Sequence, residues 1–422
     1  MERTDRRVVI TGVGLVTALG NTSEATWRGV VEGRSGIGSL TRFDSGDLPE
    51  AVRIAGEVKD FVVEPVLDRK EARRMDLFIQ YALVAADEAL RHAGMGGLTR
   101  VLDPDETGVI VGSGIGGIGT ILDTADLARE KGTGRVSPFF IPGVIGNLAA
   151  AQIAIRIGAR GPNYATVSAC ASSNHAIGDA YHVIRRGDAT TMVAGGAEAA
   201  LTQLSYAGYH AARALATEYD APETASRPFD LRRNGFVHAE GAGILVLESL
   251  ESALDRRATI LAEVLGIGLS ADAHHVTAPP EDGGGAGLAM QRALRSAGLG
   301  PEEVDYINAH GTSTPVGDLA ETRAIRRVFG PHADRIPISS IKSMLGHALG
   351  ASAAIEAVVC VNALRESIVP PTINLTDPDP ECDLDYVPHE ARRADLRTAI
   401  SNSFGFGGAN TALVLGRWEN SE

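Results

Sequence analysis

The sequence predicts an α/β protein in which strands, largely parallel, alternate with helices. Short runs rich in Val and Ile alternate with longer Ala-rich helical stretches along the whole chain. Only 5% of the residues are aromatic and 49 are glycine, a composition that suits layers packed closely through small side chains. With 422 residues, the chain can form two large domains or one two-lobed unit with a substantial core.

The individual elements follow from these runs in chain order. We expect helices over residues 71–93 and 285–297, where apolar and charged residues recur at helical spacing. The β-prone runs predict strands at residues 7–11, 108–112, 191–195, 243–247, 260–267, 304–308, 337–339, 398–401 and 411–415.

Weak similarity between two parts of the sequence indicates that the chain is duplicated. The run Val167–Cys170 leads into a helix rich in Ala and Ser, and so does Ser339–Ala354. The strand-then-glycine run Arg7–Gly14 resembles Leu261–Gly268. Two related halves, residues 1–255 and 256–422, would explain both similarities. No Pro-, Ser- or Gly-rich linker separates them, so we expect the halves to pack as one body.

Composition excludes several classes of protein. The net charge of −14 argues against general nucleic-acid binding, which needs a basic surface. No window approaches ~18 uninterrupted apolar residues, so we expect no membrane span, and the N-terminus reads as a first strand and not a signal peptide. The three cysteines are too few and too scattered for a disulfide framework or a CxxC metal site. We therefore expect a cytoplasmic protein without a bound metal.

Cys170 lies where a β-prone stretch ends and a small-residue helix begins. The start of a helix offers free backbone N–H groups and the positive end of the dipole, both of which favour thiolate over thiol. Cys170 is therefore a candidate nucleophile. The alternative for an isolated cysteine is a buried, inert side chain.

Two histidines sit in similar contexts further along the chain. His310 follows a strand in the run Asn-Ala-His-Gly-Thr-Ser-Thr, among residues suited to hold a polar ligand. His347 lies five residues after Lys342 at a second strand-to-helix junction. Glu356 on the following helix could neutralise Lys342, since an unpaired buried ammonium would be costly. Each histidine, taken alone, could instead be structural.

Two glycine-rich loops allow more than one interpretation. The run Gly112–Gly117 fits the GxGxxG pattern of a dinucleotide site, but no acidic residue follows a second strand about 20 positions later. Its glycines more plausibly let the loop pass close to another backbone or to a ligand. The run Ser401–Asn410 carries Phe404 and Phe406 and could be an ordinary turn, a mobile flap or a donor to an oxyanion.

The combination of residues favours one kind of chemistry. One nucleophilic cysteine with two histidines is not the arrangement of a cysteine protease, which has an orienting Asn or Asp. Two neutral imidazoles that donate hydrogen bonds to one oxygen suit the stabilisation of an enolate, which decarboxylation of a malonyl thioester generates. The basic cluster Arg69–Arg74 is either a solvated helix start or a docking patch for an acidic partner.

These motifs together resemble the elongating, Cys-His-His type of β-ketoacyl-acyl carrier protein (ACP) synthase, most closely the synthase II branch of bacterial fatty acid synthesis. The resemblance covers about residues 5 to 417. It rests on Ser-Ala-Cys170-Ala-Ser, Asn-Ala-His310-Gly-Thr-Ser-Thr, Lys342 followed by Gly-His347, and Gly405-Phe-Gly-Gly. It implies a thiolase-like α-β-α-β-α five-layer sandwich of two duplicated βαβαβα halves, which is normally dimeric.

The resemblance also implies a role for each motif. Cys170 would take the acyl chain as a thioester, while His310 and His347 would support malonyl-ACP decarboxylation. The backbone N–H groups of Cys170 and Phe406 would form an oxyanion hole. Lys342 would set the electrostatics of the site. The supporting residues implied behind it are Glu356 and Asp318.

Other matched positions concern the substrate and its carrier. The implied contacts with the phosphopantetheine arm are Thr312 and Thr314, and those with the acyl chain are Ile115 and, from the neighbouring subunit, Phe140. The implied gate to malonyl entry is Phe404 with Phe406. The positions where the family meets its acidic carrier protein are Lys70, Arg73, Arg74 and Arg213, which favours the docking interpretation of the basic cluster.

The expected function is therefore that of a 3-oxoacyl-ACP synthase in fatty acid elongation, an acyltransferase that needs no cofactor beyond the phosphopantetheine of its carrier. The alternative is the ketosynthase subunit of a type II polyketide or polyene pathway acting with a chain-length factor. A degradative thiolase would need a second cysteine within 401–410, a synthase III would have Asn at His347, and a chain-length factor would lack Cys170. An inactive scaffold of the same fold is the remaining, disfavoured interpretation. Expected partners are ACP and either a second copy or a chain-length factor.

Overall fold

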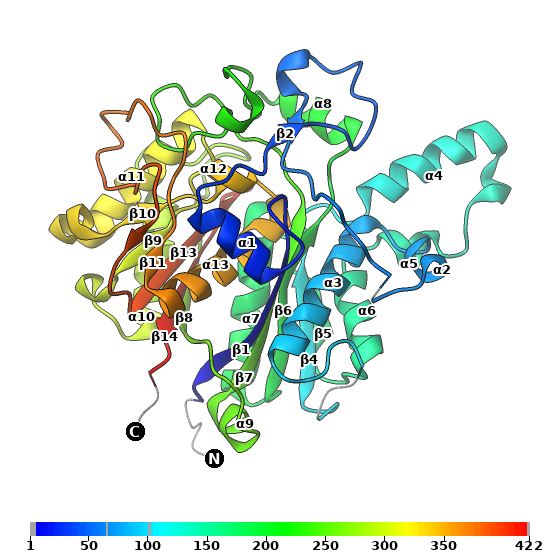
Figure 1. The fold of residues 1–422 in the computed structure, drawn as a ribbon, viewed down its shortest axis with the longest axis horizontal. Coiled ribbons are helices and arrows are strands. Elements are labelled where there is room, and N and C mark those ends of the chain that lie inside the picture. Colours follow the sequence, from blue (N-terminus) through cyan, green and yellow to red (C-terminus); the bar gives the residue numbers. More distant parts are fainter. Residues whose placement is uncertain (1–5, 65, 100–102, 420–422) are drawn as a thin grey trace.

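The computed structural model describes residues 6–64, 66–99 and 103–419. Its main feature is a ten-stranded sheet in the order β10-β9-β13-β14-β8-β1-β7-β6-β4-β5 (Figure 1). The strands are β1 (Val8–Val16), β4 (Thr107–Gly112), β5 (Asn163–Tyr164), β6 (Thr191–Glu198), β7 (Gly241–Ser249), β8 (Ala262–Ala271), β9 (Tyr306–Asn308), β10 (Ile338–Ser339), β13 (Thr398–Gly405) and β14 (Ala409–Arg417).

The sheet consists of two five-stranded sets with the same internal order. Read outward from the centre, β1, β7, β6, β4 and β5 form one set, and β8, β14, β13, β9 and β10 form the other. The sets meet where β1 pairs with β8 in antiparallel register, Val8 opposite Val264. The runs that resemble each other in sequence therefore lie in the two central strands.

Two buried helices lie between the two sets of strands. Helix α7 (Ser172–Arg186) packs on β6 and β4, and α13 (Ser352–Glu366) packs on β7 and β13. The two helices also contact each other. On the outer faces, α3 (Leu77–His92) and α6 (Leu148–Ile157) cover the first set, while α10 (Gly284–Ala297) covers the second and α11 (Pro315–Phe329) packs on α10. Helix, sheet, helix, sheet and helix thus succeed one another as five layers.

The sheet is mixed, so the prediction of largely parallel strands is wrong. Four neighbouring pairs are parallel, namely β10–β9, β13–β9, β4–β5 and β4–β6, and the other five are antiparallel. Strands β13 and β14 form a hairpin, and β7 and β8 flank β1 in the opposite direction. Hydrophobic runs mark buried strands but carry no information on strand direction.

The expected helix over residues 71–93 is in fact two helices. A short helix α2 (Arg69–Ala72) ends at Arg73, and α3 begins only after Asp76. Asp76 caps α3 by accepting a hydrogen bond from the backbone N–H of Phe78 (3.2 Å). A buried carboxylate at this position favours a new helix start over a continuing helix.

The remaining elements are short or peripheral. Helix α4 (Ile118–Lys131) buries none of its residues and projects from the body (Figure 1). The others are α1 (Ser23–Val31), α5 (Phe140–Val144), α8 (Gln203–Ala211), α9 (Leu250–Asp255), α12 (Lys342–Leu345), the strand pair β2 (Gly38–Ser39) with β3 (Ile54–Ala55), and the pair β11 (Ile368–Val369) with β12 (Arg392–Arg393). Within the described part of the chain, we find no helix with the length and apolarity to cross a membrane.

Candidate active site

Cys170 lies in a tight turn at the entrance to the central helix α7. The turn Ala169–Ala171 is a 3₁₀ helix, and Ala169 adopts a left-handed conformation with φ of 50°. An alanine held in this region is strained, so the surrounding structure must hold the turn in place. The Ser403 hydroxyl donates to the Cys170 carbonyl (2.8 Å), and the Ser168 N–H donates to the Ser172 hydroxyl (2.9 Å). These two hydrogen bonds fix the turn that carries the Cys170 thiol.

The second half of the chain contains a matching turn. Residues Leu349–Ala351 form a 3₁₀ turn that leads into α13, and Leu349 has φ of 46°. In this turn Gly350 occupies the position that Cys170 occupies in the first half. The duplication thus places two similar helix entrances side by side, and only one of them carries a nucleophile.

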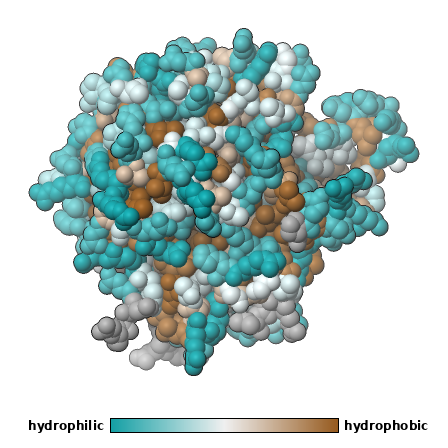
Figure 2. Space-filling view, viewed as in Figure 1, coloured by the Kyte–Doolittle hydropathy of each residue, from teal (hydrophilic) through white to brown (hydrophobic). Residues whose placement is uncertain are grey.

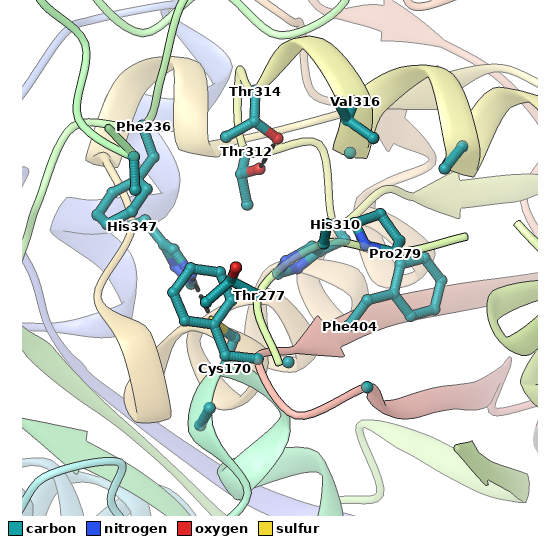
Figure 3. Close-up of a pocket in the computed structure, with 18 of the residues that line it drawn as sticks. Cys170, Phe236, Thr277, Pro279, His310, Thr312, Thr314, Val316, His347 and Phe404 are labelled. Carbon is teal, nitrogen blue, oxygen red and sulfur yellow. Dashed lines mark hydrogen bonds between the residues drawn. The ribbon is translucent and has the colours of Figure 1, made fainter. Parts of the chain in front are cut away.

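The side chains of Cys170, His310 and His347 meet between these two entrances (Figure 3). His347 Nε2 lies 2.9 Å from Cys170 Sγ, although the two residues are 177 positions apart in the sequence. His347 Nδ1 lies 2.9 Å from the Ser352 hydroxyl. The imidazole rings of His310 and His347 are nearly perpendicular, with centroids 5.5 Å apart. Both histidines can therefore reach one substrate atom placed near the sulfur.

Both imidazoles are held in the neutral form. Burial lowers the pKa of His310 well below its usual value, and the Lys342 ammonium and His347 lower it further. Burial and Lys342 act in the same direction on the pKa of His347. The Nδ1 atom of His310 is buried without a hydrogen-bond partner among the described residues. No described neighbour at Nδ1 fixes the tautomer of His310, so Nε2 is free to carry the proton when a substrate oxygen lies beside it.

The sequence argument for a lowered Cys170 pKa is wrong for the free protein. Burial is the largest influence and raises the pKa of the thiol to about 11. Lys342 and the backbone N–H groups of Phe406 and Cys170 lower it, and Glu198 raises it further. The helix entrance does favour the thiolate, but desolvation outweighs that effect. The resting side chain is therefore a thiol whose proton must be accepted when the sulfur reacts.

Lys342 forms a buried ion pair behind the two histidines. Its ammonium contacts the Glu356 carboxylate and donates to the His310 backbone carbonyl (2.6 Å). Both side chains of the pair are only 2% exposed. Removal of one partner would leave an uncompensated buried charge, which typically costs about 3–5 kcal/mol. The ion pair thus anchors the backbone that carries His310.

Two acidic side chains of α11 hold the loop around His310. Glu321, which the sequence analysis missed, accepts hydrogen bonds from the backbone N–H groups of His310 (2.9 Å) and Gly311 (2.8 Å). Asp318 accepts from the N–H groups of Ser313 (3.2 Å) and Phe229 (2.9 Å). Burial raises the pKa of Asp318 to about 7. The signal for Glu321 was its spacing of three residues from Asp318, which places both on one helix face.

A second missed residue is Glu198, at the end of β6. Its carboxylate is fully buried and accepts hydrogen bonds from Ser113 Oγ (3.1 Å) and from the N–H groups of Gly114 (2.6 Å), Ile115 (3.2 Å) and Gly350 (3.0 Å). An acidic residue in an otherwise apolar strand run was the available signal. No motif around Glu198 drew attention to it.

A cavity of about 530 Å³ opens in front of Cys170, His310 and His347. The sequence-predicted residues that line it are Ile115, Arg213, Thr312, Thr314, Phe404 and Phe406. The hydroxyls of Thr312 and Thr314 are hydrogen bonded to each other (3.0 Å) and lie above the histidines (Figure 3). The lining also includes Tyr209 and Phe236, which the sequence analysis did not single out.

The glycine-rich loop between β13 and β14 forms one wall of this cavity. Phe404 packs against His310 with ring centroids 5.7 Å apart, and Phe406 is 38% exposed. The loop is tied to the segment after β8, because Gly407 N–H donates to the Val276 carbonyl (2.7 Å). Gly407 has φ of 83°, a conformation that favours glycine.

Four sequence-predicted residues lie away from the cavity. Lys70 and Arg73 are exposed around α2, and the Arg74 guanidinium stacks over Phe139 (4.1 Å). Phe140 begins α5 and does not line the cavity of its own chain. The structure thus separates the predicted docking residues of α2 from Arg213, which lies at the cavity.

The chemistry of the three central side chains also permits metal binding. The ligand atoms of Cys170, His310 and His347 all lie within 4.8 Å of one another. In the described part of the chain, this is the one set of three or more His, Cys, Asp and Glu side chains with such spacing. A thiolate with two imidazoles could hold a soft ion such as Zn²⁺.

This fold and this site define the thiolase-like class of α/β proteins, with a cysteine at the entrance to one of two paired central helices. Residues 5–253 match the model for the N-terminal domain of β-ketoacyl synthases, and residues 261–376 match the model for the C-terminal domain. The chain belongs to the β-ketoacyl synthase family.

Similar proteins agree with this assignment. The chain is 52% identical to 3-oxoacyl-[acyl-carrier-protein] synthase 2 of Synechocystis sp. over 98% of this chain and 99% of that protein. Among solved structures, the ishigamide ketosynthase/chain length factor has a TM-score of 0.90 at 36% identity, covering 99% of this chain and all of the other. The complex AntDE:AntF, a type II PKS acyl-carrier protein with its ketosynthase bound to the hexaketide, has a TM-score of 0.89 at 34% identity, with 99% and 100% covered.

Proposed function

We propose that the protein is a 3-oxoacyl-ACP synthase of fatty acid elongation, an acyltransferase that condenses malonyl-ACP with an acyl chain held on Cys170. The observation that carries the proposal is the contact between Cys170 Sγ and His347 Nε2, with the neutral His310 beside them. The name and the coverage of the Synechocystis relative support the substrate class.

In the first half-reaction, Cys170 takes the acyl group from its carrier. The sulfur attacks the thioester carbonyl, the new carbon–sulfur bond forms, and the bond to the carrier sulfur breaks. His347 Nε2 accepts the thiol proton and passes it to the departing carrier thiolate. The Ser352 hydroxyl can donate or accept, so it fits whichever tautomer of His347 is present.

In the second half-reaction, malonyl-ACP loses CO₂ and its electrons form an enolate. His310 Nε2–H hydrogen bonds to the enolate oxygen and stabilises it. His347 donates a second hydrogen bond after its proton has moved from Nδ1 to Nε2, and its Nδ1 then accepts from the Ser352 hydroxyl. The enolate carbon attacks the acyl carbonyl, the carbon–carbon bond forms, and Cys170 leaves as a thiolate that takes a proton from solvent. The products are 3-oxoacyl-ACP and CO₂.

The backbone N–H groups of Cys170 and Phe406 serve as the oxyanion hole in both attacks. Both N–H groups lower the pKa of the Cys170 thiol, so they favour negative charge at this place, which supports the role. Phe404 and Phe406 gate the entry of malonyl-ACP. Lys342 helps to keep His310 and His347 neutral, while Glu356 pairs with Lys342 and Asp318 holds the loop after His310 in place.

The carrier supplies the only prosthetic group the reaction needs, and no step requires a metal. Its phosphopantetheine arm contacts Thr312 and Thr314, and the acyl chain lies against Ile115 and against Phe140 of the neighbouring subunit. The acidic carrier docks on the basic residues of α2 and on the cavity rim, namely Lys70, Arg73, Arg74 and Arg213. The similarity to a ketosynthase in complex with its carrier protein supports this partner.

A polyketide ketosynthase is the second candidate function. It is favoured by one observation, namely that two of the similar solved structures are ketosynthases of that kind, with 34–36% identity. The polyketide function comes second because the chain is more similar, over nearly its whole length, to a 3-oxoacyl-ACP synthase 2.

We further propose a dimer, with a second copy or a chain-length factor covering the face around α4 and β5. Strand β5 is an outer edge of the sheet, and no residue of α4 is fully buried within its own chain. Each chain would consist of two halves, residues 1–255 and 256–422. A cytoplasmic location would suit the three cysteines, none of which is paired.

Mass spectrometry of the intact protein tests the function. Incubation with acyl-ACP should add one acyl group to the wild type and none to Cys170→Ala. Addition of malonyl-ACP to the acylated wild type should then release 3-oxoacyl-ACP. Wild type that acquires no adduct, or a Cys170→Ala variant that acquires the same adduct, would show that the proposed reaction is wrong.

Activity of the chain purified alone separates the two candidate functions. Purified alone, a fatty acid enzyme should form a homodimer that elongates saturated acyl-ACP. A chain that is inactive alone, and condenses only when a chain-length factor is added, would favour the polyketide function.

A further inference from the structure

Glu198 is the most unusual buried charge near the active site. Its carboxylate is 0% exposed, and no cation within the described residues forms an ion pair with it. Four donors surround it instead: Ser113 Oγ and the backbone N–H groups of Gly114, Ile115 and Gly350. The four donors lower the pKa of the Glu198 carboxyl, but burial is the larger influence and raises it. A charge buried at this cost needs a local function.

The four donors come from two separate segments. Ser113, Gly114 and Ile115 belong to the loop after β4, and the Ile115 side chain lines the cavity. Gly350 belongs to the turn between His347 and α13. Among the residues that the structure describes, Glu198 is the one side chain that hydrogen bonds to both segments. Its carboxylate thus connects the Ile115 loop, which forms one wall of the cavity, to the turn that follows His347.

The fit between these segments leaves little space. A Cβ atom added at Gly350 would lie 2.3 Å from the Gly114 nitrogen and 2.7 Å from Glu198 Oε2. A Cβ atom added at Gly114 would also lie 2.7 Å from Glu198 Oε2. Both backbones therefore pass against the carboxylate directly, and a shorter or uncharged side chain would leave N–H groups unpaired.

We propose that Glu198 is a positioning residue that fixes the Ile115 wall of the acyl cavity relative to the His347 turn. This inference rests on the proposed function, because it treats the cavity as the site of an acyl chain. The carboxylate acts through Ile115 and His347 and does not touch the substrate. Chain-length preference and the ionisation of Cys170 both depend on it.

The charge of Glu198 gives the proposal a readout that a structural role alone would not change. The charged side chains that shift the pKa of Cys170 are Lys342 and Glu198, and the other titratable groups near the sulfur are His310, His347 and Tyr209. Glu198 raises the pKa of Cys170. A neutral side chain at position 198 should therefore lower the pKa of Cys170. Loss of packing alone would leave that pKa unchanged.

The test compares three variants with the wild type. Glu198→Gln removes the charge and keeps the size, Glu198→Asp keeps the charge and shortens the side chain, and Ser113→Ala removes one donor from the same loop. Thiolate absorbance is followed against pH, with the Cys170→Ala spectrum subtracted for each. Initial condensation rates are measured for a series of saturated acyl-ACP chain lengths.

We expect Glu198→Gln to form thiolate at lower pH than the wild type, with about tenfold more thiolate for each unit of pKa. Its ratio of long-chain to short-chain rates should change on the order of tenfold or more, since small misplacements near a reacting centre are costly. Glu198→Asp should change the ratio and keep the thiolate titration. Ser113→Ala should keep the titration as well.

The proposal is overturned if Glu198→Gln titrates like the wild type, or if it shows the same chain-length ratio. If Glu198→Gln does not fold cooperatively, Glu198→Asp decides, and an unchanged ratio in that variant overturns the proposal. A wild type that transfers no acyl chain would contradict the proposed function, whereas the thiolate titration would still test Glu198.

Discussion

Reactivity at Cys170 depends on proton transfer more than on a lowered thiol pKa. Burial raises the pKa to about 11, so the thiol is the dominant form at pH 7. His347 Nε2 at 2.9 Å offers the acceptor that a resting thiol needs. The residue is thereby kept unreactive toward general electrophiles and becomes a nucleophile when a thioester is bound beside it.

Loss of either histidine should damage decarboxylation more than acylation of Cys170. His310→Ala removes a donor to the enolate and leaves the contact between Cys170 and His347 intact, so acyl transfer should persist. Removal of one oxyanion donor typically lowers the rate about 10²- to 10³-fold. CO₂ release from labelled malonyl-ACP and adduct formation by mass spectrometry measure the two steps separately.

His347→Ala should impair both steps. Acylation is slowed because His347 accepts the thiol proton, and the larger loss should be in decarboxylation. Condensation at the wild-type rate by both variants would refute the assignment of the histidines. Folding of each variant is verified by its thermal unfolding profile.

At the scale of elements, α3 illustrates how a helix is tied to its neighbours by one buried carboxylate. Glu88 on α3 accepts hydrogen bonds from the backbone N–H of Leu15 in β1 (2.8 Å) and of Ser23 in α1 (2.8 Å). Burial raises the pKa of Glu88 to about 7. The carboxylate holds three elements together, yet it is less stable in the fold when ionised than when protonated.

Glu88 should make the stability of the protein depend on pH. The folded pKa of about 7 lies above the ordinary value of 4.5, so the folded state binds the proton more tightly. Stability from this group is full below about pH 4.5 and is lost as the pH rises toward 7, by about 3 kcal/mol at most. Thermal unfolding at pH 5 and pH 8 measures the effect.

The matched variant is Glu88→Gln, which cannot titrate. The stability of the wild type relative to Glu88→Gln should fall between pH 5 and pH 8. A difference that stays constant over this range would mean that Glu88 does not titrate there.

The sequence predicted the positions of helices and strands better than it predicted the direction of the strands and the boundary between two successive helices. Strand runs such as residues 191–195 were located correctly, because β-branched residues concentrate in buried strands. The break between α2 and α3 was missed, since Asp76 reads as one more polar residue in a helical pattern. Strand direction depends on connections that span many residues, and no local pattern records it.

The candidate site was predictable where motifs are local. Cys170, His310 and His347 each stand beside glycine or small residues at the end of a strand run, and that context marked them. Glu198 and Glu321 were not predicted because their partners are backbone N–H groups, which no sequence motif records. The contact between Glu198 and Gly350 also exists only after the two halves have come together.

At the scale of the whole molecule, an apolar surface extends over consecutive elements that pack on one another. Hydrophilic side chains dominate the face in Figure 2, and α4 stands clear of the body. We define the α4–β5 patch as the exposed apolar side chains of this region: Ile121, Phe139, Ile141, Ile145, Ile155, Tyr164 and Val167. A surface of this kind usually marks an interface.

A charge in the α4–β5 patch should separate the proposed dimer. Ile155→Asp places a carboxylate on α6 at a side chain that is 70% exposed in the single chain. An unpaired charge buried in an interface costs several kcal/mol, so the dissociation constant should rise more than a hundredfold. Light scattering after size-exclusion chromatography measures the mass of the assembly.

The control is Leu254→Asp on α9, a 55% exposed apolar residue outside the patch. It should leave the assembly intact. A wild type that runs as a monomer, or an Ile155→Asp variant that stays dimeric, would contradict the proposed interface.

The central position of β1 has a consequence for how the protein is made. Both strands that flank β1, namely β7 and β8, lie more than 200 residues later in the chain. At ~5–20 residues per second, a ribosome needs some tens of seconds to synthesise them. During that time a largely apolar strand, which is wholly buried in the fold, has emerged without a pairing partner and is prone to aggregation. Strand β1 is thus synthesised long before its neighbours in the sheet, and the nascent chain should depend on chaperones until β8 emerges.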